Sequence, residues 1–339
     1  MGKTKRFIFL AGFCALALIL AVGAGSVNVS PMDTVRVIAG KLFGFGGGGV
    51  DPAVEAILWK IRLPRALLAF LAGSGLAVSG VVMQSILRNP LASSYTLGVS
   101  AGAALGATVA IALKWSFLGI MTLPVFGAAS GMLTVFLALG AASRVDRNMQ
   151  NNSIILTGMA LSLFADAMIT VVMALSREQL HRLVFWQMGS FSMKTAGYPL
   201  ALFPFVIAGT LIAMSRSREL DIMTLGDEQA QVSGVGVKRL KIFMIILGTL
   251  LTGVVVSMVG IIGFIDLFTP HAARKVFGAN HRRVIPASAL MGGAFMVLCD
   301  LAARTVAAPV ELPVGAVTSA IGAPFFIYLY FSGRKKKSP

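Results

Sequence analysis

The sequence predicts an all-α membrane protein, a bundle of about ten transmembrane helices with both termini in the cytoplasm. Hydrophobic residues make up 57% of the 339 residues, charged residues only 12%, and the mean hydropathy is +0.85. A soluble domain carries about twice that share of charged residues. Apolar stretches of roughly 18 or more residues recur along the whole length, and each is long enough to cross a bilayer core. We therefore expect one multi-pass membrane domain over residues 1–339.

Ten apolar segments are the predicted spans. The run from Phe7 to about Ala24 follows basic residues, as in a secretory signal, but its length favours an uncleaved first helix. Segment 263–280 is shorter than the others, contains Pro270 and ends in charged residues, so nine spans are the alternative to ten. The segments are 7–27, 66–87, 95–113, 118–141, 153–175, 197–214, 242–262, 263–280, 284–304 and 313–331.

The basic residues favour ten spans. With a cytoplasmic N-terminus, the predicted inside segments hold most of the 29 Lys and Arg residues, including the tail Arg334–Lys337. Cytoplasmic segments of membrane proteins carry such an excess. The net charge of +16 therefore reflects topology. It does not indicate nucleic-acid binding, because no basic face with interleaved aromatic residues is present.

Two connections between the predicted spans are long. Residues 28–61 are expected outside and contain the glycine-rich run Gly44–Gly49, in which Phe45 is the one residue with a side chain to pack. Residues 215–241 are expected inside and form the most polar stretch of the chain. That stretch is either a solvated loop or a docking element for a partner. Its length and its alternation of small and charged residues favour the docking element.

Small residues at helical spacing predict close packing of helices. Gly98, Gly102 and Gly106 recur at every fourth residue in one predicted span, and Gly127 and Gly131 do so in the next. Glycines on one face let helix backbones approach closely, which is how membrane helices gain contact without a hydrophobic driving force. A hinge or a pathway-lining surface is the functional alternative.

Motifs for enzymatic chemistry are missing from the sequence. It has no G-x-x-x-x-G-K-[ST] motif, so any ATP must be bound and hydrolysed by a partner chain. Neither an H-E-x-x-H motif nor a paired-cysteine motif indicates a metal site. The three histidines fall near span ends and do not cluster. We therefore expect a protein that is not an enzyme and carries no cofactor or metal of its own.

Three acidic residues fall within or near the predicted spans: Asp166, Asp266 and Asp300. Intramembrane acids are costly and are candidates for function, for example in a proton relay. The structural alternative is that each acid pairs with a basic neighbour or a hydroxyl group. Asp300 and Arg304 are four residues apart and can meet on one helix face.

Two blocks of residues carry motifs in a fixed order. The first block contains Arg62-Leu-Pro-Arg65, Leu76-Ala-Val-Ser-Gly80, Gln84, Arg88-Asn-Pro-Leu-Ala92 and Leu97-Gly98. The second contains Gly260-Ile-Ile-Gly-Phe264, Pro270-His271, Arg274, His281-Arg282, Pro286, Asp300, Arg304, Leu312-Pro-Val-Gly315, Thr318 and Gly322-Ala-Pro-Phe325. Together with Trp186-Gln-Met-Gly189, which looks like a short extracytoplasmic helix of the family, they resemble the FecCD family of ABC importer permeases for iron chelates, haem and cobalamin. The resemblance covers nearly the whole chain.

The resemblance implies a ten-helix permease in the inner membrane of a bacterium. Family members pair as homodimers with the transport path between the two copies. Two ATPase subunits, which bind the ATP, dock on the cytoplasmic side, and an extracytoplasmic substrate-binding protein docks on the other. The implied partners are therefore a second copy of this chain, these proteins and membrane lipid.

The resemblance also assigns roles to particular residues. In the cytoplasmic segment 215–241, the ATPase-coupling positions are Leu225, Gly226, Ala230, Ser233 and Gly234. Ser233 stands where the family usually has leucine, Ser94 where it often has proline, and Asp266 where it often has glycine. The family uses arginines at the positions of Arg62, Arg65 and Arg304 to pair with glutamates of the binding protein. Charges at the rim of such an interface steer docking.

The function implied is import by ATP-driven alternating access. The stretch Ser93-Ser-Tyr-Thr-Leu-Gly98 is more similar to permeases for ferric siderophores than to those for cobalamin or haem. A cobalamin or haem permease of the same family is the first alternative. A proton-coupled secondary transporter that uses the three intramembrane acids is the second, and it would work without an ATPase.

Overall fold

The computed structural model describes residues 2–25, 29–43, 50–146 and 149–334, and all regular structure in these ranges is helical. The glycine-rich run Gly44–Gly49 and the basic residues Lys335–Lys337 lie outside the described residues. The α-helices are α1 (Lys3–Gly23), α2 (Pro31–Phe43), α3 (Pro52–Ala56), α4 (Leu63–Ile86), α5 (Val99–Ala112), α6 (Thr122–Val145), α7 (Asn151–Leu175), α8 (Leu180–Gln187), α9 (Gly197–Ser215), α10 (Ser217–Met223), α11 (Asp227–Val232), α12 (Val237–Val259), α13 (Ile265–Phe277), α14 (His281–Thr305) and α15 (Val314–Arg334).

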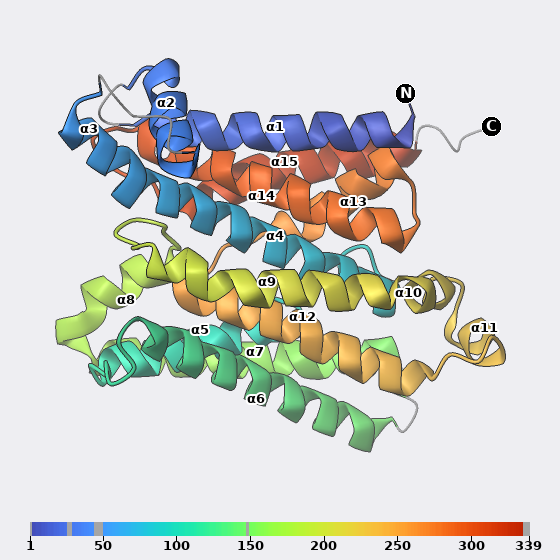
Figure 1. Cartoon of the computed structure of the whole chain (residues 1–339). Coiled ribbons are helices and arrows are strands. Elements are labelled where there is room, and N and C mark those ends of the chain that lie inside the picture. The colour runs from blue at the N-terminus through green and yellow to red at the C-terminus, as the bar shows by residue number, and fades with distance from the viewer. Residues whose placement is uncertain (1, 26–28, 44–49, 147–148, 335–339) are drawn as a thin grey trace.

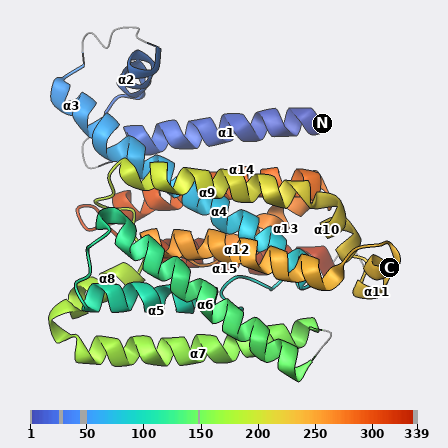
Figure 2. The same ribbon diagram turned by 60° about the horizontal axis from the view of Figure 1, so that its bottom comes forward.

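The long helices run side by side and define two ends of the bundle (Figures 1 and 2). Helices α10 and α11 project at one end, the α11 end, where α1 also begins and α15 ends (Figure 1). Helices α2, α3 and α8 lie at the opposite end, the α8 end. The described start and finish of the chain therefore lie at the same end of the bundle.

Helix α4 is the buried centre of the bundle, and it packs against α9, α12, α13 and α14. Glycine permits the closest of these contacts. A Cβ atom on Gly73 would lie 2.2 Å from the carbonyl oxygen of Gly292 in α14, and one on Gly80 would lie 1.9 Å from that of Asp266 in α13. No side chain fits at such distances, so glycine at these positions allows the direct backbone contact on which membrane helix packing relies.

The connection 28–61 is more helical than the sequence predicts. Helix α2 occupies part of it, and the helix containing α4 begins at Pro52 rather than at residue 66. A π-helical stretch, Ile57–Arg62, joins α3 to α4 just before Pro64. Proline has no N–H to donate and its ring crowds the preceding turn, so a widened turn lets the helix continue past it. The charged residues of this stretch hide its helical character from a hydropathy argument.

Seven helices among the described residues are long and apolar enough to cross a membrane: Lys3–Gly23, Pro52–Ile86, Gly119–Val145, Asn151–Leu175, Gly197–Ser215, Val237–Val259 and His281–Thr305, the second and third including adjoining helical turns. Val99–Ala112 and Val314–Tyr328 are shorter apolar helices. Helix α13 has 13 residues and spans about 20 Å, less than the hydrocarbon core. The short helices α5 and α13 both follow non-helical segments that lie within the bundle.

The three glycines of the fifth helix region occupy different surroundings. Gly98 precedes α5 in a left-handed conformation with φ of +80°. Gly102 lies against Thr134 of α6, where an added Cβ atom would be 2.2 Å from the hydroxyl oxygen. Gly106 lies against the backbone of Phe126, also in α6. Two of the three glycines therefore face one neighbouring helix, and the first sits at the turn that starts α5.

Candidate functional site

A buried cluster of charged residues lies at the α8 end. Arg65 of α4 donates from Nε and Nη2 to Asp300 of α14, with N–O distances of 2.8 to 3.1 Å. Its Nη1 atom donates to Glu311 at 2.8 Å. The Asp300 side chain is 1% exposed and that of Arg65 is 10% exposed. Such a forked guanidinium–carboxylate pair fixes geometry as well as charge, and here it joins α4 to the far end of α14.

Two further arginines of this cluster bind the end of α1. Arg62 donates to the carbonyl oxygens of Val22 (3.2 Å) and Gly23 (2.6 Å). Arg304 donates to the carbonyl oxygens of Ala24 (2.8 Å) and Ala21, and its Nε lies 3.6 Å from Asp300. The last carbonyl groups of a helix lack partners within the helix, and cations are stabilised there. Both guanidinium groups therefore donate hydrogen bonds to the carbonyl groups that lack partners at the C-terminus of α1.

The three arginines predicted for docking lie together at one end of the bundle, but they are buried within the chain. Arg62 is 6% exposed, and the Arg304 side chain is 8% exposed. The predicted contact between Asp300 and Arg304 is confirmed, and Asp300 is neutralised rather than free to relay protons. Glu311 was not singled out from the sequence. Its only signal is that it is the sole charged residue in the largely apolar connection 306–313 before α15.

Glu311 lies in the connection between α14 and α15, outside the apolar spans, and its side chain is 41% exposed. Burial by itself raises the pKa of this carboxyl group. The hydrogen bonds and the positive charge of Arg65 outweigh that effect, so the pKa of Glu311 is lowered from its ordinary value. The carboxylate is therefore ionised near neutral pH and remains paired with Arg65.

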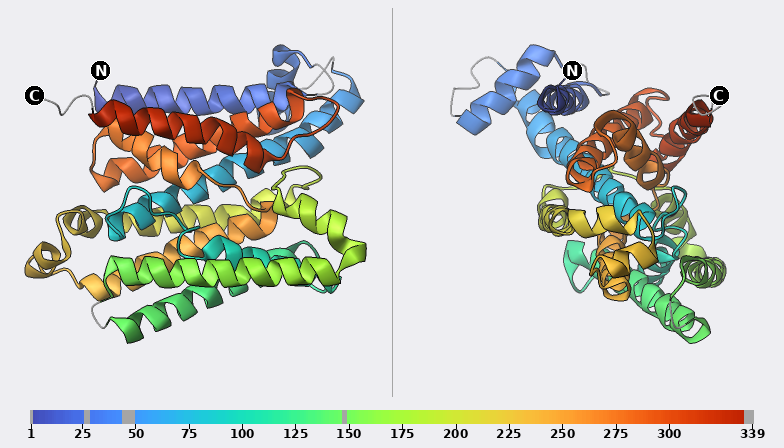
Figure 3. Two further views of the ribbon diagram at one scale, coloured as in Figure 1. Left: turned by 180° about the vertical axis from the view of Figure 1, so that it is seen from behind. Right: turned by 90° about the vertical axis from the view of Figure 1, so that its right-hand side faces the viewer.

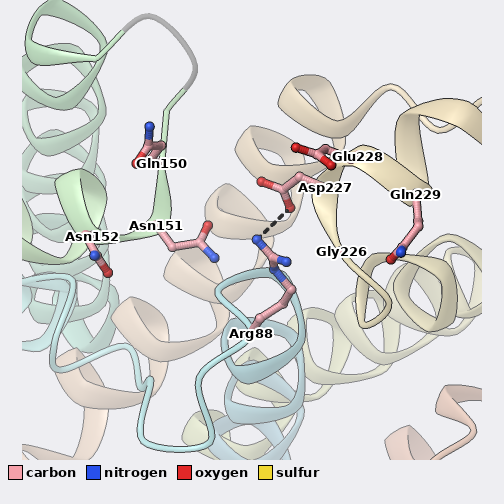
Figure 4. Close-up of a pocket in the computed structure, with 8 residues that line it drawn as sticks. All are labelled: Arg88, Gln150, Asn151, Asn152, Gly226, Asp227, Glu228 and Gln229. Atoms are coloured by element: carbon pink, nitrogen blue, oxygen red, sulfur yellow. Dashed lines mark ion pairs between the residues drawn. The ribbon is translucent and has the colours of Figure 1, made fainter.

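At the α11 end, the segment that holds α10 and α11 is tied to three long helices. The Lys241 side chain of α12, 1% exposed, donates to Asp227 of α11 at 2.7 Å and to Asn151 of α7 at 2.9 Å. Arg88, just after α4, pairs with Asp227 at 3.3 Å (Figure 4). A buried ammonium group needs such partners to offset its lost hydration. These contacts therefore connect the start of α11 to α4, α7 and α12.

The residues around this anchor line a polar cavity of about 460 Å³. Figure 4 shows Asn151 and Asn152 on one side of it and Gly226, Asp227 and Glu228 on the other. The cavity is formed between α7 and the segment that carries α11. Neither Asp227 nor Asn151 was predicted as a site residue, since a single polar residue at a helix start has no distinctive sequence signal.

The predicted coupling residues lie on and around α11. Leu225 is exposed, Ala230 is fully buried, and the exposed Ser233 hydroxyl donates to the Gln229 carbonyl oxygen of its own helix. Gly226 and Gly234 have positive φ values of +132° and +83°, so they form the turns before and after α11. Val232, which the sequence did not single out, is 91% exposed. Leu225 and Val232 therefore place apolar side chains on the outside of this segment.

A second set of contacts connects α10 with the interior. Asp221 of α10 accepts hydrogen bonds from the backbone N–H of His281 (2.9 Å) and lies 2.6 Å from its Nδ1 atom. The Nε2 atom of His281 lies 2.5 Å from the Ser85 hydroxyl oxygen. Arg274 of α13 contacts the same hydroxyl and donates to the amide oxygen of Gln84. The Gln84 amide in turn donates to backbone carbonyls at the start of α13. A continuous buried chain thus links α10 to α13.

The other two intramembrane acids differ from Asp300. Asp166 is exposed near the middle of α7. Asp266, in the first turn of α13, is 2% exposed and lines a cavity. No group of three or more His, Cys, Asp or Glu residues that could hold a metal ion is found in the part of the chain that the structure describes. The structure therefore brings together the arginines and Asp300 at one end and leaves Asp166 and Asp266 apart from them.

These features define a helical, multi-pass membrane protein with a polar, anchored segment at one end. The model of the FecCD transport family matches residues 13–332. The chain belongs to the FecCD transport family.

Similar proteins align with this chain over almost its full length. The chain is 39% identical to the uncharacterized ABC transporter permease protein YvrB of Bacillus subtilis, covering 96% of this chain and 93% of that protein. It is 32% identical to the hemin transport system permease protein HmuU of Yersinia pestis, covering 99% of each. Among solved structures, an inward-facing conformation assigned to a metal-chelate type ABC transporter matches with a TM-score of 0.84 and 31% identity, covering 97% of this chain and 99% of that one.

Proposed function

We propose that this chain is the permease subunit of a binding-protein-dependent ABC importer for a ferric siderophore or a related metal chelate. The observation that carries the proposal is the agreement in fold, over almost the whole chain, with a transporter of the metal-chelate type. The chain supplies the membrane path and binds no ATP itself, because its sequence lacks a phosphate-binding loop. ATP hydrolysis belongs to a partner.

In the proposed topology, ten segments cross the inner membrane of a bacterium and both termini are cytoplasmic. The α11 end is the cytoplasmic end. The excess of basic residues there supports this orientation, and so does the arrangement of α1 and α15, which begin and finish at the same end (Figure 1). Helices α5, α13 and α15 supply the three segments beyond the seven long apolar helices.

The α11 segment is the proposed contact for two ATPase subunits. Its exposed apolar residues, Leu225 and Val232, can enter a groove on an ATPase, while Lys241 and Asp227 hold the segment to the bundle. Closure of the ATPase pair would then move α4, α7 and α12 together, and this movement would open and close the path. Ser233 contributes no apolar surface to this contact. The neighbouring exposed Val232 would supply the apolar contact in its place.

The α8 end is the proposed contact for the extracytoplasmic binding protein. The resemblance places Arg62, Arg65 and Arg304 at this contact. They are largely buried and bonded within the chain, so in this proposal they shape the docking surface and would pair with acidic side chains of the partner only after leaving their internal partners. A second copy of this chain would cover the face that carries α7 and α15, and the path would run between the two copies. Exposed Asp166 in the middle of α7 supports this arrangement, since a carboxylate facing lipid at that depth is costly.

The experiment is uptake of radiolabelled metal chelates by cells that lack the gene, compared with cells in which the gene is restored, under iron starvation. Ferric siderophores, ferric citrate, haemin and cobalamin form the panel. We expect loss of uptake for one ferric chelate and recovery on complementation. A selective loss of haemin or cobalamin uptake would assign that chelate as the substrate in place of a ferric siderophore, and the permease function would stand. Unchanged uptake of the whole panel would overturn the proposal.

A further inference from the structure

A cavity of about 610 Å³ lies beside the break between α12 and α13. Its wall includes Tyr95 from the segment before α5, Gln187 at the end of α8, Phe264 before α13 and Ser319 of α15. In Figure 3 (left), the connection that joins α12 to α13 lies between α15 and α7. The cavity therefore belongs to the face that would border the path in the proposed dimer.

The backbone at this break is held in an unusual conformation. Phe264 has a φ value of +72°, which is uncommon for a residue with a large side chain. Gly260 has a φ value of +81°, and a Cβ atom on it would lie 2.1 Å from the Trp186 carbonyl oxygen. Tyr95 donates a hydrogen bond to the Ile262 carbonyl oxygen at 2.5 Å. Such local strain persists where surrounding contacts enforce it, and it is common at functional sites.

Asp266 is one of the residues that line this cavity, and its carboxylate is buried beside it. Oδ2 accepts a hydrogen bond from the Ser94 N–H at 3.3 Å, and the N–H groups at the start of α13 lie against the same carboxylate. Oδ1 is buried and has no hydrogen-bond partner among the described side chains and backbone groups. The residue is 2% exposed. An acceptor left without a partner in such a site costs free energy that a bound donor would recover.

The chain does not direct a cationic side chain at this carboxylate. The basic residue of α13 that points inward, Arg274, lies two helical turns further along and donates instead to Gln84 and Ser85. Among the described residues, no ion pair to Asp266 is found, whereas Asp300 pairs with Arg65. A buried carboxylate of this kind favours a partner that brings positive charge or hydrogen-bond donors from outside the chain.

We propose that the cavity at the α12–α13 break is a binding subsite for a positively charged group, with Asp266 as the residue that selects it. The inference rests on the proposed function, because it places the subsite on the transport path. The charge can come from an ammonium group of a transported chelate or from a small metal cation such as Na⁺. Tyr95, which donates to the Ile262 carbonyl oxygen, is a further residue in the wall of the subsite.

The first test is chemical labelling of Asp266 in the purified chain in lipid nanodiscs, so it does not depend on transport. A water-soluble cationic carbodiimide with an amine nucleophile labels accessible carboxyl groups, and mass spectrometry locates the modified residue. The probes are ferrioxamine B, a ferric trihydroxamate with a free ammonium group, its N-acetylated form, and NaCl against choline chloride. Glu178, an exposed surface acid, is the internal control.

We expect ferrioxamine B to protect Asp266 from labelling at roughly tenfold lower concentration than its N-acetylated form, because the ammonium group adds one charge-assisted hydrogen bond. The N-acetylated form should protect much less, and labelling of Glu178 should stay unchanged. Protection by Na⁺ alone would assign the subsite to a small metal cation. Equal protection by the charged and neutral chelates, or no protection by any probe, would overturn the proposal.

The second test uses transport. In cells that express Asp266→Asn, uptake of a chelate carried by this system should fall roughly tenfold for a form with an ammonium group. Uptake of the neutral form should be retained in Asp266→Asn. The control variant Glu178→Gln should retain uptake of both forms, since Glu178 is an exposed surface acid. An equal loss of both forms in Asp266→Asn would show a structural role only. Failure of the proposed function is distinguishable, because deletion of the gene would then leave uptake of every chelate unchanged.

Discussion

Replacement of Asp300 by leucine should destabilise the α8 end, because it leaves three buried arginines with one remaining carboxylate. Arg65 would lose all of its contacts with Asp300 and keep only Glu311. Arg304 would lose its nearest acid. The carbonyl groups at the end of α1 would still accept hydrogen bonds, but they carry no full negative charge to balance the guanidinium groups.

The size of this effect follows from burial. Asp300 is 1% exposed and the Arg65 side chain is 10% exposed, so water replaces little of the lost interaction. Removal of one partner from a buried ion pair costs about 3–5 kcal/mol. We therefore expect the free energy of unfolding of Asp300→Leu to fall by about that amount. The double variant Arg65→Met, Asp300→Leu should recover part of the loss, because position 65 then no longer holds a buried charge without its main partner, although Arg304 still lacks its acid.

The assay is reversible unfolding of the purified chain by steric trapping in lipid bicelles, analysed as a double-mutant cycle. Glu178→Gln is the control, since Glu178 pairs with Lys114 at the surface and both side chains are well exposed. It should leave the free energy of unfolding almost unchanged. A coupling free energy between Arg65 and Asp300 below about 1 kcal/mol would refute the claim that this buried pair stabilises the fold. The arginines would then be available to pair with a partner protein.

Three further predictions follow from other parts of the structure. Gly80→Ala should abolish folded protein on size-exclusion chromatography, because its Cβ atom would overlap the backbone of α13, while Gly140→Ala, with open space around it, should elute as the parent protein does. Lys241→Met should leave the chain folded but lower the amount of chelate taken up per ATP hydrolysed, because the Lys241–Asp227 contact that holds α11 is lost. The same uptake per ATP as in the parent protein would argue against this role of the contact. The pKa of Glu311 is lowered in the folded state, so its stabilising contribution is present above the ordinary glutamate pKa and is lost as the pH falls through the lowered value. Melting temperatures should therefore drop on acidification in the parent protein and drop less in Glu311→Gln.

The helical bundle could be predicted from the sequence because long apolar runs have few other solutions in a bilayer. The predicted segment 242–262 corresponds to α12, and even the short segment 263–280 corresponds to α13. The helix from Pro52 was missed, because its first turns carry charged residues and its continuation past Pro64 depends on a π-helical stretch. Hydropathy records apolar length and gives no signal for such a backbone adjustment.

Pairings across the bundle were mostly beyond prediction. Asp300 and Arg304 were paired correctly because helical periodicity fixes a spacing of four residues. Arg65 and Asp300 are 235 residues apart, so only the packing of α4 on α14 brings them together. In the sequence, Lys241 looks like an ordinary basic residue at a membrane boundary. Its burial could not be predicted, because it depends on Asp227 and Asn151 from two other elements. The docking and coupling roles of the predicted residues stay predictions.

The most direct test of the account is the energy source for uptake. Spheroplasts that contain the chain and its partners would receive the binding protein loaded with radiolabelled chelate, after depletion of ATP or after collapse of the proton gradient. The account predicts that uptake stops when ATP is depleted while the gradient is intact, and that it continues without the gradient while ATP remains. Uptake that survives ATP depletion and stops when the gradient is collapsed would contradict the account and show a proton-coupled transporter.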